Sequence, residues 1–453
     1  MAKITAPNTA DIKDYQLKLE QYRREHEKLQ ILLNITHNIS RELDLSKLLM
    51  LIMDEVKTVL QCDRCTVFVL NRETGELWSR VAHGEKEIRF PSHLGIAGFV
   101  ATSGEVLNIP DAYADERFNP NIDKKTGYVT RTILAVPMRN KLSEIIGVFQ
   151  SLNKIGGPFC QDDIELLDAI SSIAATQIEN AQLYAEQKKT FDSFIETLAT
   201  TIDARDPLTA GHSRRIALYA DEIARVLNLG DSEREVLRTA ALLHDYGKIA
   251  VREAILTKEG KLTDEEFKHI QHHPYYTRTI LEKINFSRAL KDVPMIAASH
   301  HEKLDGSGYP QGLIEREIPK LGKILAVVDV FDALTSKRHY RDRMNLTQVL
   351  GILSQGANTH FDDFFIAAFK KIPLSRLVEI LEDDHQKDLD LNDLEELGKS
   401  DISALLSALE SPSPDGHQLA MMKQFNHYYS RDYLQGKKNS KTASPIKFTG
   451  KEE

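Results

Sequence analysis

The chain has 453 residues and a formal net charge of −9, with 42% hydrophobic and 28% charged residues. This length exceeds what one hydrophobic core usually supports, so the sequence predicts a multidomain globular protein. The negative charge argues against a general surface for nucleic acids or anionic membranes, and no apolar run approaches the length of a membrane span. The first residues lack a signal-peptide core, and three cysteines are too few for a secreted disulfide framework. We therefore expect a cytoplasmic protein with no nucleic-acid partner and no membrane contact.

Residues 1–44 are predicted to contain a long N-terminal helix. Apolar and aromatic residues recur there at alternating spacings of three and four, which is the pattern of a heptad seam. The residues at this spacing are Ile12, Tyr15, Leu19, Tyr22, His26, Leu29 and Leu33. Two interpretations fit the pattern: an amphipathic helix that packs on its own domain, or a contact between two parallel copies of the chain.

Residues 45–180 alternate between helical and strand patterns, which predicts an α+β domain around one sheet. An apolar helix is expected at 48–60, and the pair Thr74 and Gly75 marks the turn of a hairpin. The segments with strand character cover residues 65–70, 105–109, 130–138 and 145–154. A helix that begins near Asp162 is expected to close this domain.

Residues 181–202 are predicted to form a connecting helix, because no glycine or proline interrupts the pattern before Pro207. A second rhythm of apolar residues at spacings of four, three and four lies in this stretch. Its members are Phe191, Ile195, Leu198 and Ile202. Together with the N-terminal seam, this rhythm predicts a parallel homodimer in which the helix transmits changes between domains. The simpler alternative is a passive spacer.

Residues 203–372 are almost wholly helical in pattern, and polar residues interrupt the apolar helices in five places. The segments are GHSRRIA, LLHDYGKI, QHHPYYT, SHHEKLDGSGYP and VVDVFDALTSKRHYR. His244 and Asp245 follow a helix that Gly247 can terminate. Asp329 lies in an apolar run, where an unpaired carboxylate is costly without a cation or hydrogen-bond donors. Imidazoles and carboxylates together favour divalent iron, manganese or zinc, and two such ions can hold a phosphodiester and activate water.

Two of these segments carry a resemblance to a known family. HDYGK and HHEKLDGSGYP match the signature of the HD-GYP family in the HD phosphohydrolase superfamily, and the likeness covers about residues 200–372. The resemblance implies an all-α HD-type domain that hydrolyses cyclic di-GMP to pGpG, with GMP as a further product. It also implies two divalent metal ions, and iron or manganese is expected because no thiolate is among the candidate ligands.

The resemblance assigns roles to residues by their positions in the motifs. The first metal is expected to bind His212, His244, Asp245 and Asp329, and the second to bind His273, His300 and His301, with Asp245 as the bridge. Asp245 and Lys248 are the expected catalytic residues. The expected substrate contacts are Lys248, Gly308, Tyr309, Arg338 and Arg341. For the two arginines, a surface ion pair is the alternative.

The sequence departs from the family pattern at two positions. Thr277 stands where the family usually has glycine, three residues after the proline of its HP element. Leu208 stands where some members have a carboxylate that holds a third metal, so two metals are expected here. Neither departure removes an expected metal ligand.

Residues 45–180 resemble GAF domains, in particular the cyclic-nucleotide-binding GAF domains of mammalian phosphodiesterases and some cyclases. The likeness lies in IPDAYADERFNPNIDKKTGYVTRTILAVPM and LNKIGGPFCQDDIELL, where Ile164 replaces the last residue of the NKFDE motif. That motif implies a buried polar lock that supports the fold. The candidate ligand contacts are Asp111, Thr126, Thr130 and Arg131. Cyclic AMP or cyclic GMP, another small ligand, and a GAF domain that serves only dimerisation are the alternatives.

Residues 373–453 are predicted to form an acidic helical segment and a partly disordered C-terminal tail. We therefore expect a GAF sensor domain, a connecting helix and an HD-type phosphodiesterase domain in one chain. Two other functions fit the sequence: a non-catalytic module that binds cyclic dinucleotides, and a phosphodiesterase for cyclic GMP-AMP. The intact ligand set argues against the first, whereas the sequence does not distinguish between cyclic dinucleotides.

Overall fold

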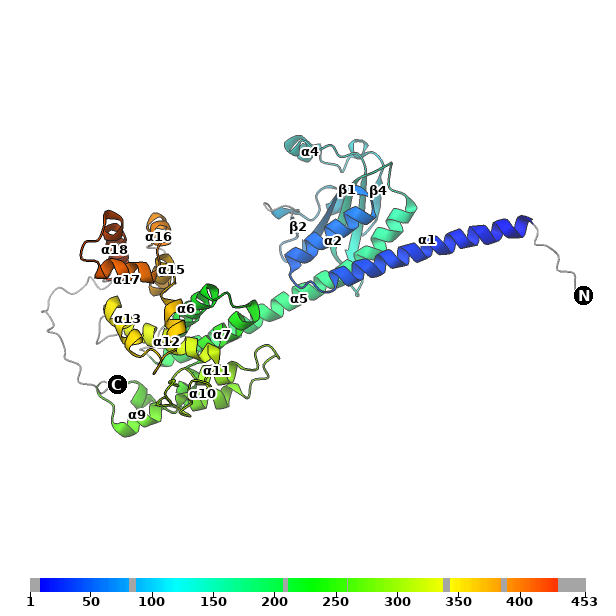
Figure 1. Cartoon of the computed structure of the whole chain (residues 1–453). Coiled ribbons are helices and arrows are strands. Elements are labelled where there is room, and N and C mark those ends of the chain that lie inside the picture. Colours follow the sequence, from blue (N-terminus) through cyan, green and yellow to red (C-terminus); the bar gives the residue numbers. More distant parts are fainter. Residues whose placement is uncertain are drawn as a thin grey trace, which may run out of the picture. The chain divides into compact units, whose positions relative to one another are not determined.

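The computed structural model describes residues 9–80, 87–206, 211–258, 260–336, 343–383 and 389–430. The chain forms two compact units, Met1–Phe191 and Asp192–Glu453 (Figure 1). The predicted fold class is confirmed, because an α+β unit with one sheet precedes a largely helical unit. None of the helices in these residues is both long enough and apolar enough to cross a membrane.

The first unit is built around one antiparallel sheet of six strands in the order β3-β2-β1-β6-β5-β4. The strands are β1 (Cys62–Asn71), β2 (Glu76–Arg80), β3 (Glu87–Pro91), β4 (Leu107–Ile109), β5 (Ile133–Arg139) and β6 (Ile145–Lys154). The predicted hairpin joins β1 to β2. In its turn Gly75 adopts a left-handed φ of 68°, which glycine does without steric cost. The long strands β1 and β6 pair at the centre, with Val67 opposite Phe149.

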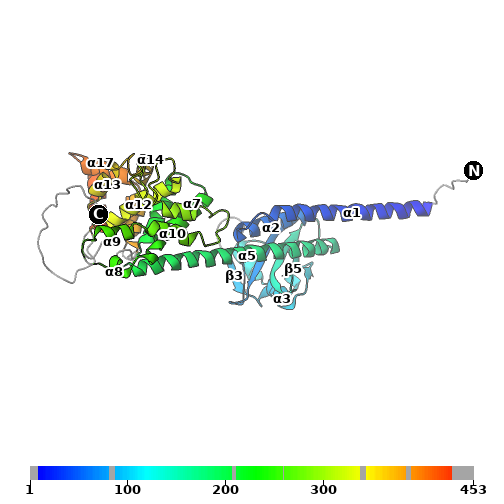
Figure 2. The ribbon, with the colours of Figure 1, turned by 90° about the horizontal axis from the view of Figure 1, so that it is seen from below.

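Alternate residues of the strands face two separate apolar cores. The helices of this unit are α1 (Thr9–Ile39), α2 (Leu45–Val59), α3 (Gly95–Ser103), η1 (Ala112–Ala114), α4 (Pro120–Thr126) and the first part of α5 (Gln161–Arg205). Val67 and Val69 join a core with α1, α2 and α5, whereas Phe68 between them joins a core with α3. Opposite faces of the sheet are therefore covered by α2 and α5 and by α3 (Figure 2).

Helix α5 is longer than predicted, since it runs unbroken from Gln161 to Arg205 and enters the second unit. The rhythm of apolar residues near its end does not form a free seam, because Ile195 and Ile202 are buried inside their own chain. These two residues therefore pack within the second unit, whereas Phe191 and Leu198 are only partly buried, and the interpretation of this rhythm as a dimer contact stays a prediction.

The second unit continues from α5 with a series of helices, of which α6, α11, α13 and α14 pack against α12. They are α6 (His212–Val226), α7 (Asp231–Leu243), η2 (Tyr246–Ala250), α8 (Glu253–Leu256), α9 (Asp264–Ile270), α10 (His273–Leu281), α11 (Val293–Ala298), α12 (Lys320–Thr335), α13 (Leu346–Gln355), α14 (Asp363–Phe369), α15 (Leu374–Leu381), α16 (Leu391–Leu397), α17 (Ile402–Glu410) and α18 (Gly416–Tyr429). Tyr219 of α6 packs edge-on against Phe331 of α12 and Phe369 of α14. The segment after residue 372 is helical in α15 to α18, and residues 431–453 lie outside the described residues.

Candidate metal centre

The expected metal ligands lie at helix ends of the second unit, apart from Asp329, which lies inside α12. His212 and His273 begin α6 and α10, whereas His244 and Asp245 follow the last residue of α7. All five are buried. The apolar faces of these helices thus bring polar residues from distant parts of the sequence to one buried place.

Asp245 lies between two groups of imidazoles. Its Oδ2 atom is 3.5 Å from His244 Nε2 and 3.9 Å from His212 Nε2. Its Oδ1 atom is 3.1 Å from His273 Nε2 and 3.8 Å from His300 Nε2. The two oxygens of one carboxylate therefore face different histidine groups, which is the arrangement that lets a carboxylate bridge two ions.

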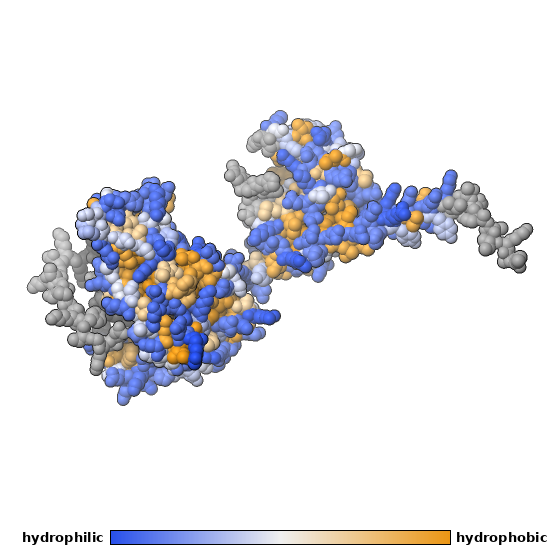
Figure 3. All heavy atoms as spheres, viewed as in Figure 1, coloured by the Kyte–Doolittle hydropathy of each residue, from blue (hydrophilic) through white to orange (hydrophobic). Residues whose placement is uncertain are grey.

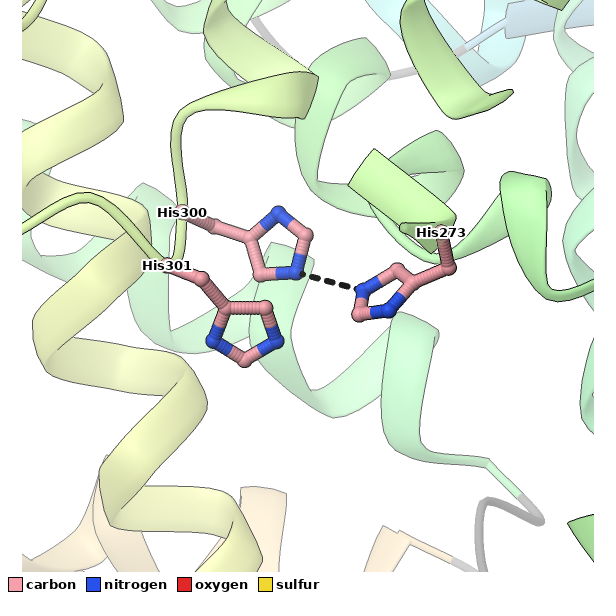
Figure 4. A group of neighbouring side chains, drawn as sticks. All are labelled: His273, His300 and His301. Carbon is pink, nitrogen blue, oxygen red and sulfur yellow. Dashed lines mark hydrogen bonds between the residues drawn. The ribbon is translucent and has the colours of Figure 1, made fainter. Parts of the chain in front are cut away.

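The remaining expected ligands, His300 and His301, follow α11 with their rings 4.1 Å apart. His300 Nε2 lies 3.3 Å from His273 Nε2 (Figure 4). Asp329 Oδ2 is 3.9 Å from His301 Nδ1, while its Oδ1 is 3.2 Å from His212 Nε2. The groups whose ligand atoms all lie within 4.8 Å, and which could hold an ion, are His273–His300–His301, His212–His244–Asp329 and His244–Asp245–His300.

Backbone carbonyls fix which nitrogen of each imidazole faces the centre. Nδ1 of His244, His273 and His300 lies 2.7, 2.8 and 2.7 Å from the carbonyl oxygen three residues earlier. A carbonyl only accepts hydrogen bonds, so Nδ1 carries the proton and Nε2 offers a lone pair to the centre. Two such lone pairs, on His273 and His300, approach closely and need a proton or a cation between them.

The unpaired polar atoms of the centre fit a metal ion. Among the described residues, His244 Nε2 is buried and has no hydrogen-bond partner. Burial lowers the pKa of His244 and His300 and lowers the pKa of His301 to about 3, so these rings are neutral near pH 7. Burial raises the pKa of Asp245, but Lys248 and the imidazoles outweigh it and hold the pKa well below its usual range. Neutral imidazoles and an ionised carboxylate are the protonation states that bind a divalent metal.

Asp332 is a residue of this centre that the sequence analysis missed. It lies one turn after Asp329 on α12, is buried, and places Oδ2 2.8 Å from His212 Nδ1. Arg215 donates to both of its oxygens, at 2.8 and 2.9 Å. Burial lowers the pKa of His212, but its hydrogen bonds to Asp329 and Asp332 outweigh burial and raise the pKa to about 10. Asp332 therefore orients the His212 ring from outside the centre, and ligation by His212 displaces a proton.

The turn that carries Lys248 also lies at the centre. Lys248 Nζ is 2.8 Å from Asp245 Oδ2 and 3.0 Å from Asp206 Oδ2. Asp206 is a second contributor that the sequence analysis did not identify. Its position directly after α5, two helices before the motif in the chain, gave no local signal.

Gly247 holds the turn close to α10. Its N–H donates to Thr277 Oγ1 at 2.8 Å, and the same hydroxyl donates to the His244 carbonyl at 2.9 Å. A Cβ atom on Gly247 would overlap the His273 carbonyl oxygen and Thr277 N. The expected role of Gly247 as a helix terminator is therefore wrong. The position needs glycine because two backbones touch, and η2 continues through it without a left-handed φ.

Two of the expected substrate contacts lie on the wall of the centre. The Tyr309 ring is 4.6 Å from the His301 ring at an interplanar angle of 32°. A Cβ atom on Gly308 would lie 2.6 Å from the His301 carbonyl oxygen, so this loop packs directly against an expected metal ligand. The expected residues Arg338, Arg341 and Leu208 lie outside the described residues.

The candidate ligand contacts of the first unit mainly support the fold. Thr130 is buried, and its hydroxyl donates to Asp123 at 2.9 Å. Asp111 is exposed and caps η1, and the Arg131 side chain is exposed. Thr126 ends α4, and its side chain lies outside the described residues.

The NKFDE-like residues hold the end of β6 to the start of α5. Lys154 Nζ is 2.7 Å from Asp163 Oδ1, and Cys160 N donates to the other oxygen of Asp163 at 2.8 Å. Asn153 Oδ1 accepts from Arg131 N at 2.6 Å. These polar groups therefore form a lock between the sheet, α5 and the loop before β5.

Comparison with protein families agrees with both units. Residues 44–178 match the family model of the GAF domain, and residues 196–364 match a family model of the HD domain. The chain carries a GAF domain and an HD domain. The GAF domain lies in the α+β unit, and the HD match contains the expected metal ligands.

Curated relatives share parts of this chain. The 3′3′-cGAMP-specific phosphodiesterase 3 of Vibrio cholerae is 44% identical over 184 residues, which are 40% of this chain and 39% of that protein. A probable cyclic di-GMP phosphodiesterase of Vibrio cholerae is 38% identical over 191 residues, 39% of this chain and 43% of that protein. The dual 3′,5′-cyclic-AMP and -GMP phosphodiesterase 11A of Takifugu rubripes is 36% identical over 187 residues, 38% of this chain and 21% of that protein. The chain thus spans less than half the length of these relatives.

Proposed function

We propose that the chain is a metal-dependent phosphodiesterase that hydrolyses a cyclic dinucleotide at the centre in its HD domain. The observation that carries this proposal is the position of Asp245, whose two oxygens face two histidine groups in one buried centre. The names of two relatives supply the substrate class, 3′3′-cGAMP and cyclic di-GMP. The proposed substrate is cyclic di-GMP, opened to pGpG, with GMP as a further product.

Two divalent ions, iron or manganese, are the proposed cofactors. The first would be held by His212, His244, Asp245 and Asp329, and the second by His273, His300, His301 and Asp245. When bound, such ions hold the phosphodiester and supply a water of lowered pKa for attack. Imidazole and carboxylate donors without a thiolate are the chemistry that supports these metals.

Residues around the proposed metal site would position its ligands and the substrate and would stabilise charge on the phosphoryl group. Lys248 places an ammonium group beside Asp245, where it would offset charge that develops on a phosphoryl oxygen. Asp332 holds the His212 ring in place. Tyr309 lies against His301 and offers an aromatic face on which a nucleotide base can stack.

Turnover of defined cyclic dinucleotides tests the proposed function. The full chain, loaded anaerobically with Fe(II) or Mn(II), is incubated with cyclic di-GMP or 3′3′-cGAMP, and products are separated by chromatography. We expect pGpG to appear from cyclic di-GMP, with a kcat/KM above that for 3′3′-cGAMP. A higher kcat/KM for 3′3′-cGAMP would change the substrate assignment. Tight binding without hydrolysis by the metal-loaded chain would instead favour a non-catalytic binding module.

We further propose that the chain is a parallel homodimer that pairs through α1, and that its GAF domain binds a regulatory ligand such as cyclic AMP or cyclic GMP. The seam predicted on α1 is available for pairing, because Tyr15, Leu19, Tyr22, Leu29 and Leu33 are all exposed. In Figure 3 the surface of this helix is mainly hydrophilic, with few apolar side chains between the charged ones. A single exposed seam with heptad spacing matches a second copy of the same helix.

A pair of substitutions on α1 tests the dimer. Leu19→Asp puts a charge on the seam and should weaken dimerisation by about tenfold or more, since it removes an apolar contact worth at least about 1.4 kcal/mol. Leu17→Asp is the matched control, because Leu17 is equally apolar and exposed but lies off the seam. Light scattering over a concentration series measures both. Equal dimerisation of the two variants would show that this seam is not the interface.

A further inference from the structure

The end of α5 and the residue that follows it contact two segments of the metal centre, the start of α6 and η2. Asp203 Oδ1 accepts from the Ser213 hydroxyl at 2.8 Å, and both side chains are buried. Ser213 directly follows His212, an expected metal ligand, in the first turn of α6. Asp203 therefore fixes the start of the helix that presents His212.

Arg205 fixes the turn η2 that carries Lys248. Its guanidinium donates to the carbonyl of Ile249 and, at 2.8 Å, to the carbonyl of Val251. These are carbonyls at the end of η2, where the short helix leaves backbone acceptors to be satisfied. Arg205 therefore holds the backbone on the C-terminal side of Lys248.

Asp206 holds the ammonium group itself. Its Oδ2 atom is 3.0 Å from Lys248 Nζ, which also lies 2.8 Å from Asp245 Oδ2. Asp206 is buried, and a buried carboxylate needs a cation or donors. Within the part of the chain that the structure describes, Asp206 belongs to none of the groups that could hold a metal ion.

We propose that the end of α5 and the residue that follows it, Asp203–Asp206, position the HD centre, and that Asp206 is the positioning residue for Lys248. This inference rests on the proposed phosphodiesterase function. Asp206 sets where the ammonium group of Lys248 stands relative to the bridging carboxylate. A shift of α5 by about 1 Å lengthens these contacts beyond hydrogen-bond range. Such a shift releases Lys248 from Asp206.

The contacts that seat α5 in the second unit lie further back on the helix. Ile195, Ala199 and Ile202 repeat at helical spacing and are buried. Arg238 of α7 lies 3.0 Å from Asp192 and 2.6 Å from Glu196. These contacts keep α5 in place when a single residue near its end is changed. The effect of such a substitution can therefore be attributed to the position of Lys248.

A double-mutant cycle tests the role of Asp206. Asp206→Asn keeps the shape of the side chain but removes its charge, and should lower kcat by about tenfold to a hundredfold with metal content unchanged. Lys248→Met should lower kcat by about a hundredfold. The double variant should be no slower than Lys248→Met alone, because both changes act through one ammonium group. Asp168→Asn, at an exposed position of the same helix, should retain wild-type kcat.

Three results would overturn the inference. They are wild-type kcat in Asp206→Asn, multiplicative losses in the double variant, or loss of metal from Asp206→Asn.

A second readout, hydrogen exchange, does not depend on activity. The amide of Val251 donates to the Lys248 carbonyl at 3.0 Å and closes η2. Its hydrogen exchange should become about tenfold faster in Arg205→Gln and stay unchanged in Glu196→Gln. If the wild type hydrolyses no cyclic dinucleotide, the proposed function fails, and unchanged exchange in Arg205→Gln would separately refute the positioning role.

Discussion

Asp245→Ala is expected to reduce turnover by about a thousandfold or more, because the carboxylate that faces both histidine groups contributes several kcal/mol to the centre. The wild type should hold close to two metal ions per chain, and the variant should hold fewer. Helical content should be retained, since Asp245 lies after the end of α7 and takes no part in the apolar core. Turnover of the cyclic dinucleotide, metal analysis and far-UV circular dichroism measure the three quantities.

A matched control lies at the other end of the same helix. Asp231 is the first residue of α7 and its side chain is fully exposed, so Asp231→Ala should keep both metal content and turnover. If metal-loaded Asp245→Ala retained near-normal turnover, Asp245 would not be the bridging ligand. A stoichiometry of three ions in the wild type would show that the centre has a further site.

Gly247→Ala is expected to destabilise the HD domain by about 3 kcal/mol or more, because the added Cβ atom meets backbone that has no room to move. That atom would overlap the His273 carbonyl oxygen and Thr277 N, and would lie 2.8 Å from Thr277 Oγ1. Relief requires α10 to separate from η2, which also draws His273 away from Asp245. Metal content should therefore fall together with the unfolding temperature.

The single tryptophan allows the unfolding of the GAF domain to be measured separately from that of the HD domain. Trp78 lies in β2 of the GAF domain, so its fluorescence reports unfolding of that domain alone and should be unchanged in Gly247→Ala. Helical circular dichroism should show the loss. Gly351→Ala is the matched control: a Cβ atom there meets nothing within 4 Å, and alanine favours a helix interior over glycine by about 0.5–1 kcal/mol. Equal stability of the two variants would contradict the close packing at Gly247.

The sequence predicted the central strands of the sheet and the edge strand β4, but not the other edge strand, β3. The segments at β1, β5 and β6 are apolar and rich in β-branched residues, so their pattern is clear. Strand β3 (Glu87–Pro91) was not predicted, because charged residues and a proline occupy an edge strand. Helix α3 was also missed, since two glycines in nine residues weaken a helical pattern.

The expected metal ligands could be named from the motifs, but their supporting residues could not. Asp332 acts on His212 across 120 positions of sequence, and such a contact leaves no local pattern. Asp206, which directly follows α5, could not be found for the same reason, because only the fold brings it to Lys248. Apolar periodicity also did not show whether a helix face packs inside its own domain or remains exposed. Ile195 of the α5 rhythm is buried in the HD domain, whereas the seam on α1 is exposed.

Because α5 is continuous from Gln161 to Arg205, its number of residues fixes the rotation of one end of the helix relative to the other. Each residue of an α-helix adds about 100° of rotation, so one extra residue among the exposed positions 183–190 would turn the two ends of α5 against each other by that angle. Seven extra residues would nearly restore the original angle, with a drift of about 20°. An insertion of seven residues would therefore preserve the faces that the two ends of α5 bury in their own units, whereas a single insertion would not.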